Sequence, residues 1–306
     1  MNESEVLLTT QQASELLQVH ESSIKRRCNA GTLACTYTPG GHRRIPLGAL
    51  LDYARVESLP SVLTPFAGFE TEVWLALDEL RRDDVLDSFT DLGFKWLYHG
   101  YSRYVRDVID LLTAEGVKHG RVFDRLITAI MYRIGHGYVD RELTIGDEHR
   151  MTQHVRDILM HLEPLRNVPS SSRQDDGVPT AIVGCARSEV HELGALMTRR
   201  ILEFNGYNVQ YLGLDVPTEE FARAQQKFKA SLVCVSIMPP QTTRDAINVV
   251  RLLDDLYRKS SPYRLVLGGS ALNDQAPGDL RTRNLAEVVS FSELNDFEHW
   301  LLNLAD

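Results

Sequence analysis

The stretches Ala181-Ile-Val-Gly184 and Glu189-Val-His191-Glu-Leu-Gly194 decide the fold of the C-terminal part of this chain. The first is a β-branched apolar run that predicts a buried strand, and the apolar periodicity after the second predicts a helix. His191 is then expected on the strand-to-helix turn, at the edge of a doubly wound sheet where ligands bind. The Glu189 carboxylate can hold the imidazole in one tautomer and strengthen it as a metal ligand. Gly194 would let a large flat ligand approach the backbone.

Two further apolar runs end in small or polar residues at the same predicted edge. The run Ser231-Leu-Val-Cys-Val-Ser236 ends at a hydroxyl, and Leu265-Val-Leu-Gly268-Gly269 opens into paired glycines. Short continuous apolar runs are typical of strands buried on both faces of a parallel sheet. Residues 178–306 are therefore expected to form a Rossmann-like α/β domain with the hydroxyl and the glycines at its ligand-binding edge.

The spacing Glu-x-His-x-x-Gly resembles the Asp-x-His-x-x-Gly motif of cobalamin-binding domains, with Glu189 in place of the usual Asp. The resemblance implies that His191 is the lower axial ligand of cobalt, in place of the cofactor's own base. It further implies that Ser236 hydrogen-bonds the nucleotide tail of the cofactor and that the paired glycines leave room for the tail. The cofactor-binding residues expected in this domain are Glu189, His191, Gly194, Ser236, Gly268 and Gly269.

Residues 7–55 resemble the winged helix-turn-helix of MerR-type regulators. Thr9 and Gln12 predict a capping box at the start of the first helix, and Thr38-Pro-Gly-Gly-His-Arg-Arg44 matches the wing of that family. Between His20 and Arg44, five Lys or Arg stand against one acidic residue, in a chain of net charge −9. Such a basic island indicates contact with phosphates, although a solvated basic face is the alternative. The expected DNA-binding residues are Ser22, Ser23, Lys25, Arg26, Arg27, His42, Arg43 and Arg44.

The middle of the chain is predicted to be helical. Residues 72–166 carry apolar periodicity with almost no strand pattern, and their length suits a four-helix bundle. Residues 56–70, with two prolines and a glycine, predict a linker before the bundle, and residues 169–179 predict a polar hinge after it. The expected fold class is thus multidomain α and α/β. Its predicted domains are 1–57 for DNA binding, 72–166 for the bundle and 178–306 for the Rossmann-like domain.

A helical bundle ahead of a cobalamin domain resembles the modules of methionine-synthase-like proteins. In the regulatory branch the bundle carries Trp, nine residues and then Glu-His, all facing the upper side of the corrin. Here Glu148-His149 fits this pattern, whereas Tyr138 stands at the Trp position. Val139, next to Tyr138, offers no nitrogen to cobalt, so that the upper ligand, if any, is expected to be His149 or His136, or else water. The alternatives are core packing for Tyr138 and a surface acid–base pair for Glu148-His149.

Over residues 7–300 the chain resembles the cobalamin-dependent photoreceptor repressors of the MerR superfamily, the CarH/LitR type. The resemblance implies a repressor rather than an enzyme, with adenosylcobalamin as its cofactor. It also implies a homo-oligomer, expected to be a tetramer, that grips operator DNA in the dark and is released when light breaks the Co–C bond. One alternative is a light-insensitive regulator of the same architecture. It would sense cobalamin level or another tetrapyrrole, or it would be a cofactor-free repressor controlled by an antagonist. The remote alternative is a B12-dependent enzyme subunit.

The composition predicts a soluble, cytoplasmic protein with no membrane partner. No apolar run approaches the ~18 residues needed to cross a bilayer, and no secretory segment precedes Leu7. The cysteines show no Cys-x-x-Cys pairing and no disulfide framework. They are Cys28, Cys35, Cys185 and Cys234.

Overall fold

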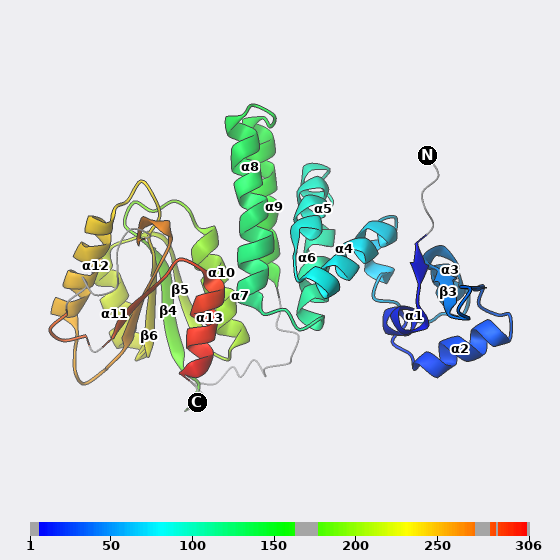
Figure 1. Ribbon diagram of the computed structural model, residues 1–306. Helices are drawn as coiled ribbons and strands as arrows, with labels where there is room; N and C mark the ends of the chain where they lie inside the picture. Colours follow the sequence, from blue (N-terminus) through cyan, green and yellow to red (C-terminus); the bar gives the residue numbers. More distant parts are fainter. Residues whose placement is uncertain (1–5, 163–176, 273–281, 286, 305–306) are drawn as a thin grey trace. The chain divides into compact units, whose positions relative to one another are not determined.

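A computed structural model of the protein describes residues 6–162, 177–272, 282–285 and 287–304 (Figure 1). The chain divides into two compact units, Met1–Trp96 and Leu97–Asp306. Residues 169–176 of the predicted hinge and the last residues of the predicted bundle, 163–166, lie outside the described ranges. The predicted domain boundaries therefore stay predictions.

The first unit begins with the predicted winged helix-turn-helix. Helices α1 (Thr10–Leu16) and α2 (Glu21–Asn29) are followed by the hairpin β2 (Thr36–Tyr37) and β3 (Arg43–Pro46) and by α3 (Leu47–Val56). Strand β1 (Leu7–Leu8) pairs with β3, which gives the sheet order β1-β3-β2. The capping box predicted at Thr9 and Gln12 is confirmed, since each side chain accepts a hydrogen bond from the backbone amide of the other residue.

Two further helices belong to the same unit. They are α4 (Glu70–Asp83) and α5 (Asp87–Tyr98), which runs to the end of the unit and two residues beyond. The segment predicted as a linker contains the short helix η1 (Thr64–Phe66), and its Phe66 ring is buried and stacks on Trp96 with centroids 6.2 Å apart. Helix α4 is bonded to α1, because Gln12 donates to Asp78 over 3.0 Å.

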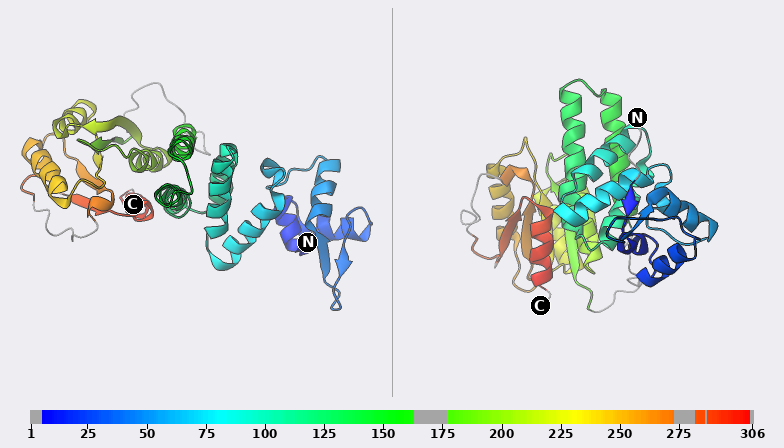
Figure 2. Two further views of the ribbon diagram at one scale, coloured as in Figure 1. Left: turned by 90° about the horizontal axis from the view of Figure 1, so that it is seen from above. Right: turned by 45° about the vertical axis from the view of Figure 1, so that its right-hand side comes forward.

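The second unit opens with helices that stand against a sheet. Helix α6 (Ser102–Ala114) is followed by α7 (His119–Val122), the π-helical segment η2 (Phe123–Thr128) and α8 (Ala129–Val139), and the last three continue one another without a break. Helix α9 (Ile145–His161) returns beside α8, and the two lie side by side in both views (Figures 1 and 2). The helical character predicted for the middle of the chain is confirmed.

The Rossmann-like domain predicted for the C-terminal part is confirmed. Its described strands form one parallel sheet in the order β5-β4-β6-β7-β8. In chain order the strands are β4 (Thr180–Ala186), β5 (Asn208–Val216), β6 (Leu232–Ser236), β7 (Arg264–Gly268) and β8 (Val288–Phe291). The helices of the domain are α10 (Leu193–Phe204), α11 (Thr218–Phe228), α12 (Thr243–Leu256) and α13 (Leu294–Asn303), with η3 (Ser270–Leu272) after β7.

Helices cover both faces of this sheet, with α11 and α12 on one face and α10 and α13 on the other (Figure 1). Every residue of β6 is buried, as expected for a strand covered on both sides. An apolar core lies between the sheet and α11 and α12. Among its members are Ile182, Val233, Val235, Leu265 and Leu267 from the strands and Phe221, Val250 and Leu253 from the helices.

Among the described residues, no helix combines the length and the apolar character that a membrane span requires.

Candidate functional site

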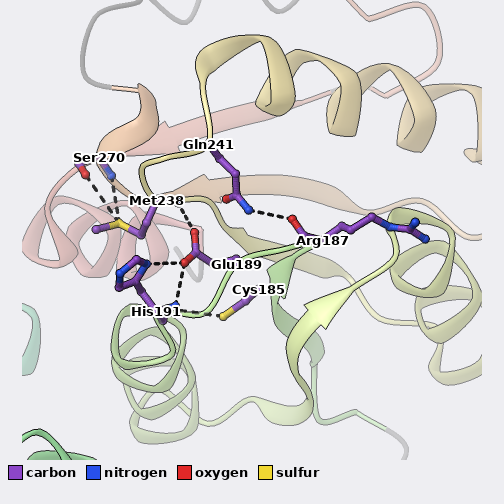
Figure 3. A network of polar contacts seen from close by, with 7 residues as sticks. All are labelled: Cys185, Arg187, Glu189, His191, Met238, Gln241 and Ser270. Carbon is purple, nitrogen blue, oxygen red and sulfur yellow. Dashed lines mark hydrogen bonds and ion pairs between the residues drawn. The ribbon is translucent and has the colours of Figure 1, made fainter. Parts of the chain in front are cut away.

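The imidazole of His191 is oriented by a buried carboxylate at the end of β4. Glu189 Oε1 accepts from His191 Nδ1 at 2.7 Å and from the backbone amide of the same residue at 2.8 Å (Figure 3). Glu189 is only 2% exposed, whereas the His191 side chain is 57% exposed. Because Nδ1 faces the carboxylate, Nε2 is the nitrogen left to bind a ligand or a metal.

The same carboxylate also holds the loop after β6. Glu189 Oε2 accepts from the backbone amide of Met238 at 2.6 Å, so that one buried side chain ties together the β4–α10 and β6–α12 turns. Figure 3 shows that the network continues to Ser270, whose backbone amide lies 3.3 Å from the Met238 sulfur. A carboxylate with three N–H donors is a strongly bonded group, and its removal would leave those donors unpaired.

The ends of the central strands lie in one row across the sheet. Cys185 of β4 pairs with Ser236 of β6, and Ser236 pairs with Gly268 of β7. The Ser236 hydroxyl has no hydrogen-bond partner among the described residues and lines the cavity described below. A Cβ at Gly194 would lie 3.7 Å from this hydroxyl, an ordinary contact, which means that protein packing does not require glycine there. The open space beside Gly194 is therefore available to a ligand.

The two glycines after β7 serve different purposes. At Gly269 the backbone has φ +112°, and a Cβ would lie 2.2 Å from the carbonyl oxygen of Ile237, so that only glycine fits. At Gly268 a Cβ would meet no atom within 4 Å. Gly268 lines the cavity, and a side chain there would project into space that a ligand could use.

A cavity of about 500 Å³ lies between the strand ends and the helices α8 and α9. We call its strand-end side the floor, which comprises His191, Gly194, Ser236, Gly268 and Gly269. We call its helical side the roof, which comprises Thr128, Met131, Tyr132, Thr152 and Arg156. A volume of this size is in the range of small-molecule sites, and the site combines an apolar wall with a few convergent polar groups.

The base of the helical pair is fastened to the sheet domain on two sides. Asp124 of η2 accepts from the backbone amides of Leu294 and Asn295 at 3.0 and 2.8 Å, and it thereby caps the first turn of α13. On the other side, Arg156 of α9 donates to Glu192 over 2.6 Å. The Tyr211 hydroxyl donates to the same carboxylate over 3.1 Å, and burial raises the pKa of that phenol, which stays protonated.

The residues predicted for the upper face of a cofactor lie beyond this cavity. Tyr138 is 45% exposed near the end of α8, and His136 and His149 are exposed as well. Glu148 and His149 are close together on the first turn of α9, with Oε2 and Nε2 3.4 Å apart. At 1.5 Å of rise per residue, Tyr138 lies about 9 Å along the helix from Tyr132. The assignment of these residues to an upper ligand stays a prediction.

The roof residues were not anticipated from the sequence, although one signal was available. Glu148, Thr152 and Arg156 recur every four residues and therefore share one face of α9. Tyr138 and Met131, seven residues apart, likewise share a face of α8. On each helix, the residues one or two turns away from the predicted position on the same face line the cavity. The amide of Met238 could not have been found in this way, because it depends on how two loops meet.

The winged helix presents the predicted DNA-binding residues in two groups. Ser22, Ser23, Lys25, Arg26 and Arg27 lie on α2, while His42, Arg43 and Arg44 lie at or in the hairpin. Arg26 is exposed and its side chain makes no ion pair among the described residues, whereas Lys25 is bonded to Glu21 at 2.9 Å. Arg43 donates to Asn29 over 2.7 Å and lies over the Tyr37 ring, so that it also fastens the wing to α2.

Comparisons with known proteins agree with this division of the chain. A family model described as a helix-turn-helix domain matches residues 7–55, and one described as a B12 binding domain matches residues 179–293. The HTH-type transcriptional repressor CarH of Myxococcus xanthus is 27% identical over 175 residues, which are 56% of this chain and 54% of that protein. A methanol–corrinoid protein of Methanosarcina barkeri is 34% identical over 94 residues, 31% of this chain and 35% of the relative.

One solved structure supports the fold. The monomethylamine corrinoid protein of Methanosarcina barkeri superposes with a TM-score of 0.50 and 14% identity, covering 71% of this chain and 99% of the other. The chain spans about half the length of the curated relatives it matches first. It combines an N-terminal helix-turn-helix domain with a C-terminal B12-binding domain, and part of it is similar to the HTH-type transcriptional repressor CarH.

Proposed function

We propose that this protein is a transcriptional repressor whose hold on operator DNA depends on bound adenosylcobalamin and is released by light. The observation that carries the proposal is the Glu189–His191 pair, which turns a free imidazole nitrogen toward a cavity in a chain that also contains a winged helix-turn-helix. The similarity to the repressor CarH supports the same reading.

The floor fits a cobalamin in several independent ways. His191 would offer its free ring nitrogen to cobalt. The unpaired Ser236 hydroxyl can bond the nucleotide tail, and the open space at Gly268 leaves room for it. Bound adenosylcobalamin supplies a cobalt–carbon bond that visible light breaks. The protein would hold the cofactor through His191, whose ring is fixed by Glu189, and the roof residues of α8 and α9 would cover it.

For the upper face we propose the residues at the far end of α8 and α9. Tyr138 stands at the position of the Trp found in related regulators, with Glu148 and His149 beside it on the neighbouring helix. His149, or else His136, is the candidate nitrogen ligand on this side. This proposal is supported by shared helix faces, since these residues continue the faces on which Met131, Thr152 and Arg156 line the roof.

Repression would depend on assembly. A single winged helix contacts few phosphates, and joining several of them in a homo-oligomer, which we propose to be a tetramer, raises affinity through effective concentration. The cofactor would favour this assembly in the dark by fixing the helices against the sheet domain. Loss of the adenosyl group would remove that constraint.

A second candidate is a corrinoid carrier that serves a separate methyltransferase. The similarity to corrinoid proteins of Methanosarcina favours it. A light-insensitive regulator is the third, and the replacement of Trp by Tyr138 at the upper face favours it. These candidates differ in whether DNA binding responds to cofactor and whether it responds to light.

The test uses the full chain with and without adenosylcobalamin. Target DNA is first selected from a pool of random duplexes, and affinity is then measured in the dark and after green light, together with the absorption spectrum and the oligomeric state. The proposal requires a shifted cobalamin spectrum, dark assembly, and loss of both assembly and DNA affinity on illumination. Equal DNA affinity in dark and light would leave the light-insensitive regulator. Cofactor binding with no DNA binding would support the corrinoid carrier.

Arg26→Ala serves as a control for the DNA surface. It removes an exposed cation from α2 and should weaken DNA binding and flatten its salt dependence while the cofactor spectrum is unchanged.

A further inference from the structure

The C-terminal end of α5 is held by a side chain from α9. Arg150 donates from its two terminal nitrogens to the carbonyl oxygens of Leu97 and Tyr98, at 3.0 and 2.8 Å. The amide of Gly100, a residue with φ +82°, also donates to Leu97. The last carbonyls of a helix have no partner within the helix, and a cation there also favours the helix dipole. Arg150 therefore closes the end of α5.

Arg150 is itself fixed by the first turn of α9. Asp147 Oδ1 lies 3.3 Å from the Arg150 guanidinium, and the other oxygen of Asp147 accepts from the amide and hydroxyl of Thr144 in a capping box. The residues between Asp147 and Arg150 are Glu148 and His149, the pair proposed for the upper face of the cofactor. Consecutive residues thus form the helix cap, the proposed cofactor-facing pair and the grip on α5.

Helix α5 is shared by the two compact units. Its residues up to Trp96 belong to the unit that contains the winged helix, and Leu97 and Tyr98 belong to the unit that contains the cofactor cavity. Within the first unit, Trp96 is fully buried and packs on Phe66 and Phe69, with ring centroids 6.2 and 5.6 Å away. Any change at the last turn of α5 is therefore covalently continuous with the core of the DNA-binding unit.

We infer that Arg150 is a positioning residue that passes the state of the cofactor site to the DNA-binding unit. When Glu148 and His149 engage or lose the upper ligand, the first turn of α9 shifts and the guanidinium tightens on or leaves the carbonyls of Leu97 and Tyr98. Hydrogen bonds weaken steeply with angle and distance, so that a small shift is enough to release the end of α5. A guanidinium that contacts two carbonyls at once fixes orientation as well as distance, which an ammonium cannot do.

This inference rests on the proposed function, and its test compares variants of the full chain. Arg150→Met keeps most of the length of the side chain but removes every donor, whereas Arg150→Lys keeps the charge and loses the paired contact. Gln153→Ala is the matched control, because Gln153 is exposed on the same helix and its side chain is bonded to Asp157 on that helix, at 2.8 Å. The readouts are affinity for adenosylcobalamin, affinity for the selected DNA with and without cofactor in the dark, and amide exchange at residues 95–99 without cofactor.

The expected result is a separation of cofactor binding from DNA response. Arg150→Met should bind adenosylcobalamin with an affinity within about twofold of the wild type. In this variant the ratio of the DNA affinities with and without cofactor should fall close to one. Because allosteric coupling typically changes affinity by about 5–150-fold, this loss is measurable. Amide exchange at the end of α5 should be faster even without cofactor. Arg150→Lys should give an intermediate ratio, and Gln153→Ala should match the wild type.

The outcomes that overturn the inference are distinguishable from one another. If the wild-type protein shows no cofactor-dependent DNA affinity, the proposed function fails and the inference fails with it. If the wild type shows that dependence and Arg150→Met keeps it, only the role of Arg150 is overturned. If Arg150→Met loses the helical signal of the folded protein, Arg150→Lys provides the test. A wild-type ratio of DNA affinities together with wild-type amide exchange in Arg150→Lys also overturns the role of Arg150.

Discussion

The floor and the roof of the cavity differ in how firmly their side chains are held. In the floor, one buried carboxylate fixes His191 through its ring and its backbone, and Gly269 occupies a place where no other residue fits. In the roof, Tyr132 is 61% exposed and makes no hydrogen bond among the described residues. A floor held in this way imposes one geometry on its ligand, whereas an exposed roof ring such as Tyr132 can adapt to what the ligand carries on its other face.

The largest effect expected from breaking the floor comes from His191→Ala. This variant removes the only imidazole that the floor offers to cobalt, so affinity for adenosylcobalamin should fall by more than the ~10–100-fold that is typical for losing an outer partner of a ligand. Titration followed by absorption spectroscopy measures the loss, and the spectrum of any bound cofactor should change. His161→Ala, on an exposed histidine of α9, is the control. Wild-type spectrum and affinity in His191→Ala would remove the metal role from this residue.

The paired glycines allow packing to be separated from ligand space. Gly269→Ala places a methyl group against the Ile237 carbonyl at a strained backbone position, and we expect a loss of at least about 1–3 kcal/mol in the free energy of unfolding. Gly268→Ala should leave that free energy within about 0.5–1 kcal/mol of the wild type, because its methyl group meets no protein atom. Its cofactor affinity should nevertheless fall. Thermal unfolding and cofactor titration of both variants measure this contrast.

Equal loss of stability in both variants would contradict the assignment of Gly268 to ligand space. Unchanged cofactor affinity in a stable Gly268→Ala protein would contradict it as well.

The difference between floor and roof also explains how far the sequence could predict the site. The floor lies where strands end, and a strand end is marked locally by an apolar run and the residues after it. His191, Ser236 and the glycines could therefore be placed on one edge from the sequence alone. The same apolar runs also predicted the parallel sheet of the C-terminal domain. What the sequence could not supply was the reach of Glu189 to the amide of Met238, 49 residues away, because that contact depends on the packing of two loops.

The roof was harder to predict because helices repeat their faces. A periodic pattern identifies which side of α8 or α9 is turned inward, but every turn of the helix offers the same side. Which turn lies over the cavity depends on where the helices are fastened. Asp124 fixes the position of the helices through its bond to α13, and Arg156 fixes it through its bond to Glu192. Both contacts join residues that are far apart in the chain.

A smaller effect on the floor is expected from Glu189→Gln. The glutamine side chain keeps an oxygen that can accept from His191, but it loses the negative charge. Its NH2 group would also face one of the three N–H donors that the carboxylate now accepts from. Cofactor affinity should therefore fall by ~10–100-fold. Glu189→Asp is the matched variant, since it keeps the charge and restores the residue usual in this motif. We expect it to bind the cofactor more tightly than Glu189→Gln while lowering thermal stability, because its shorter arm cannot serve the Met238 amide as well. Equal affinity in the two variants would show that charge at this position is unimportant.

The smallest effect separates the roof from the predicted upper face. Tyr132 lines the cavity, whereas Tyr138, which is predicted for the upper face, lies about 9 Å farther along the helix. A buried aromatic contact contributes roughly 0.5–1.5 kcal/mol, which corresponds to an affinity change of about 2–12-fold. If the cofactor binds with α8 and α9 placed as they are, Tyr132→Ala should lose this amount for adenosylcobalamin, and Tyr138→Ala should lose less.

Parallel titrations with hydroxocobalamin complete the test, because a ring that packs on the adenosyl group should matter for adenosylcobalamin alone. The opposite order of effects, with Tyr138→Ala the weaker binder and Tyr138→Trp the tighter one, would show that the helices move along the sheet domain when the cofactor binds. In that case Tyr138→Trp should also strengthen the dark oligomer, which size-exclusion chromatography in dark and light would detect. The roof, unlike the floor, would then take its final position only when the cofactor binds.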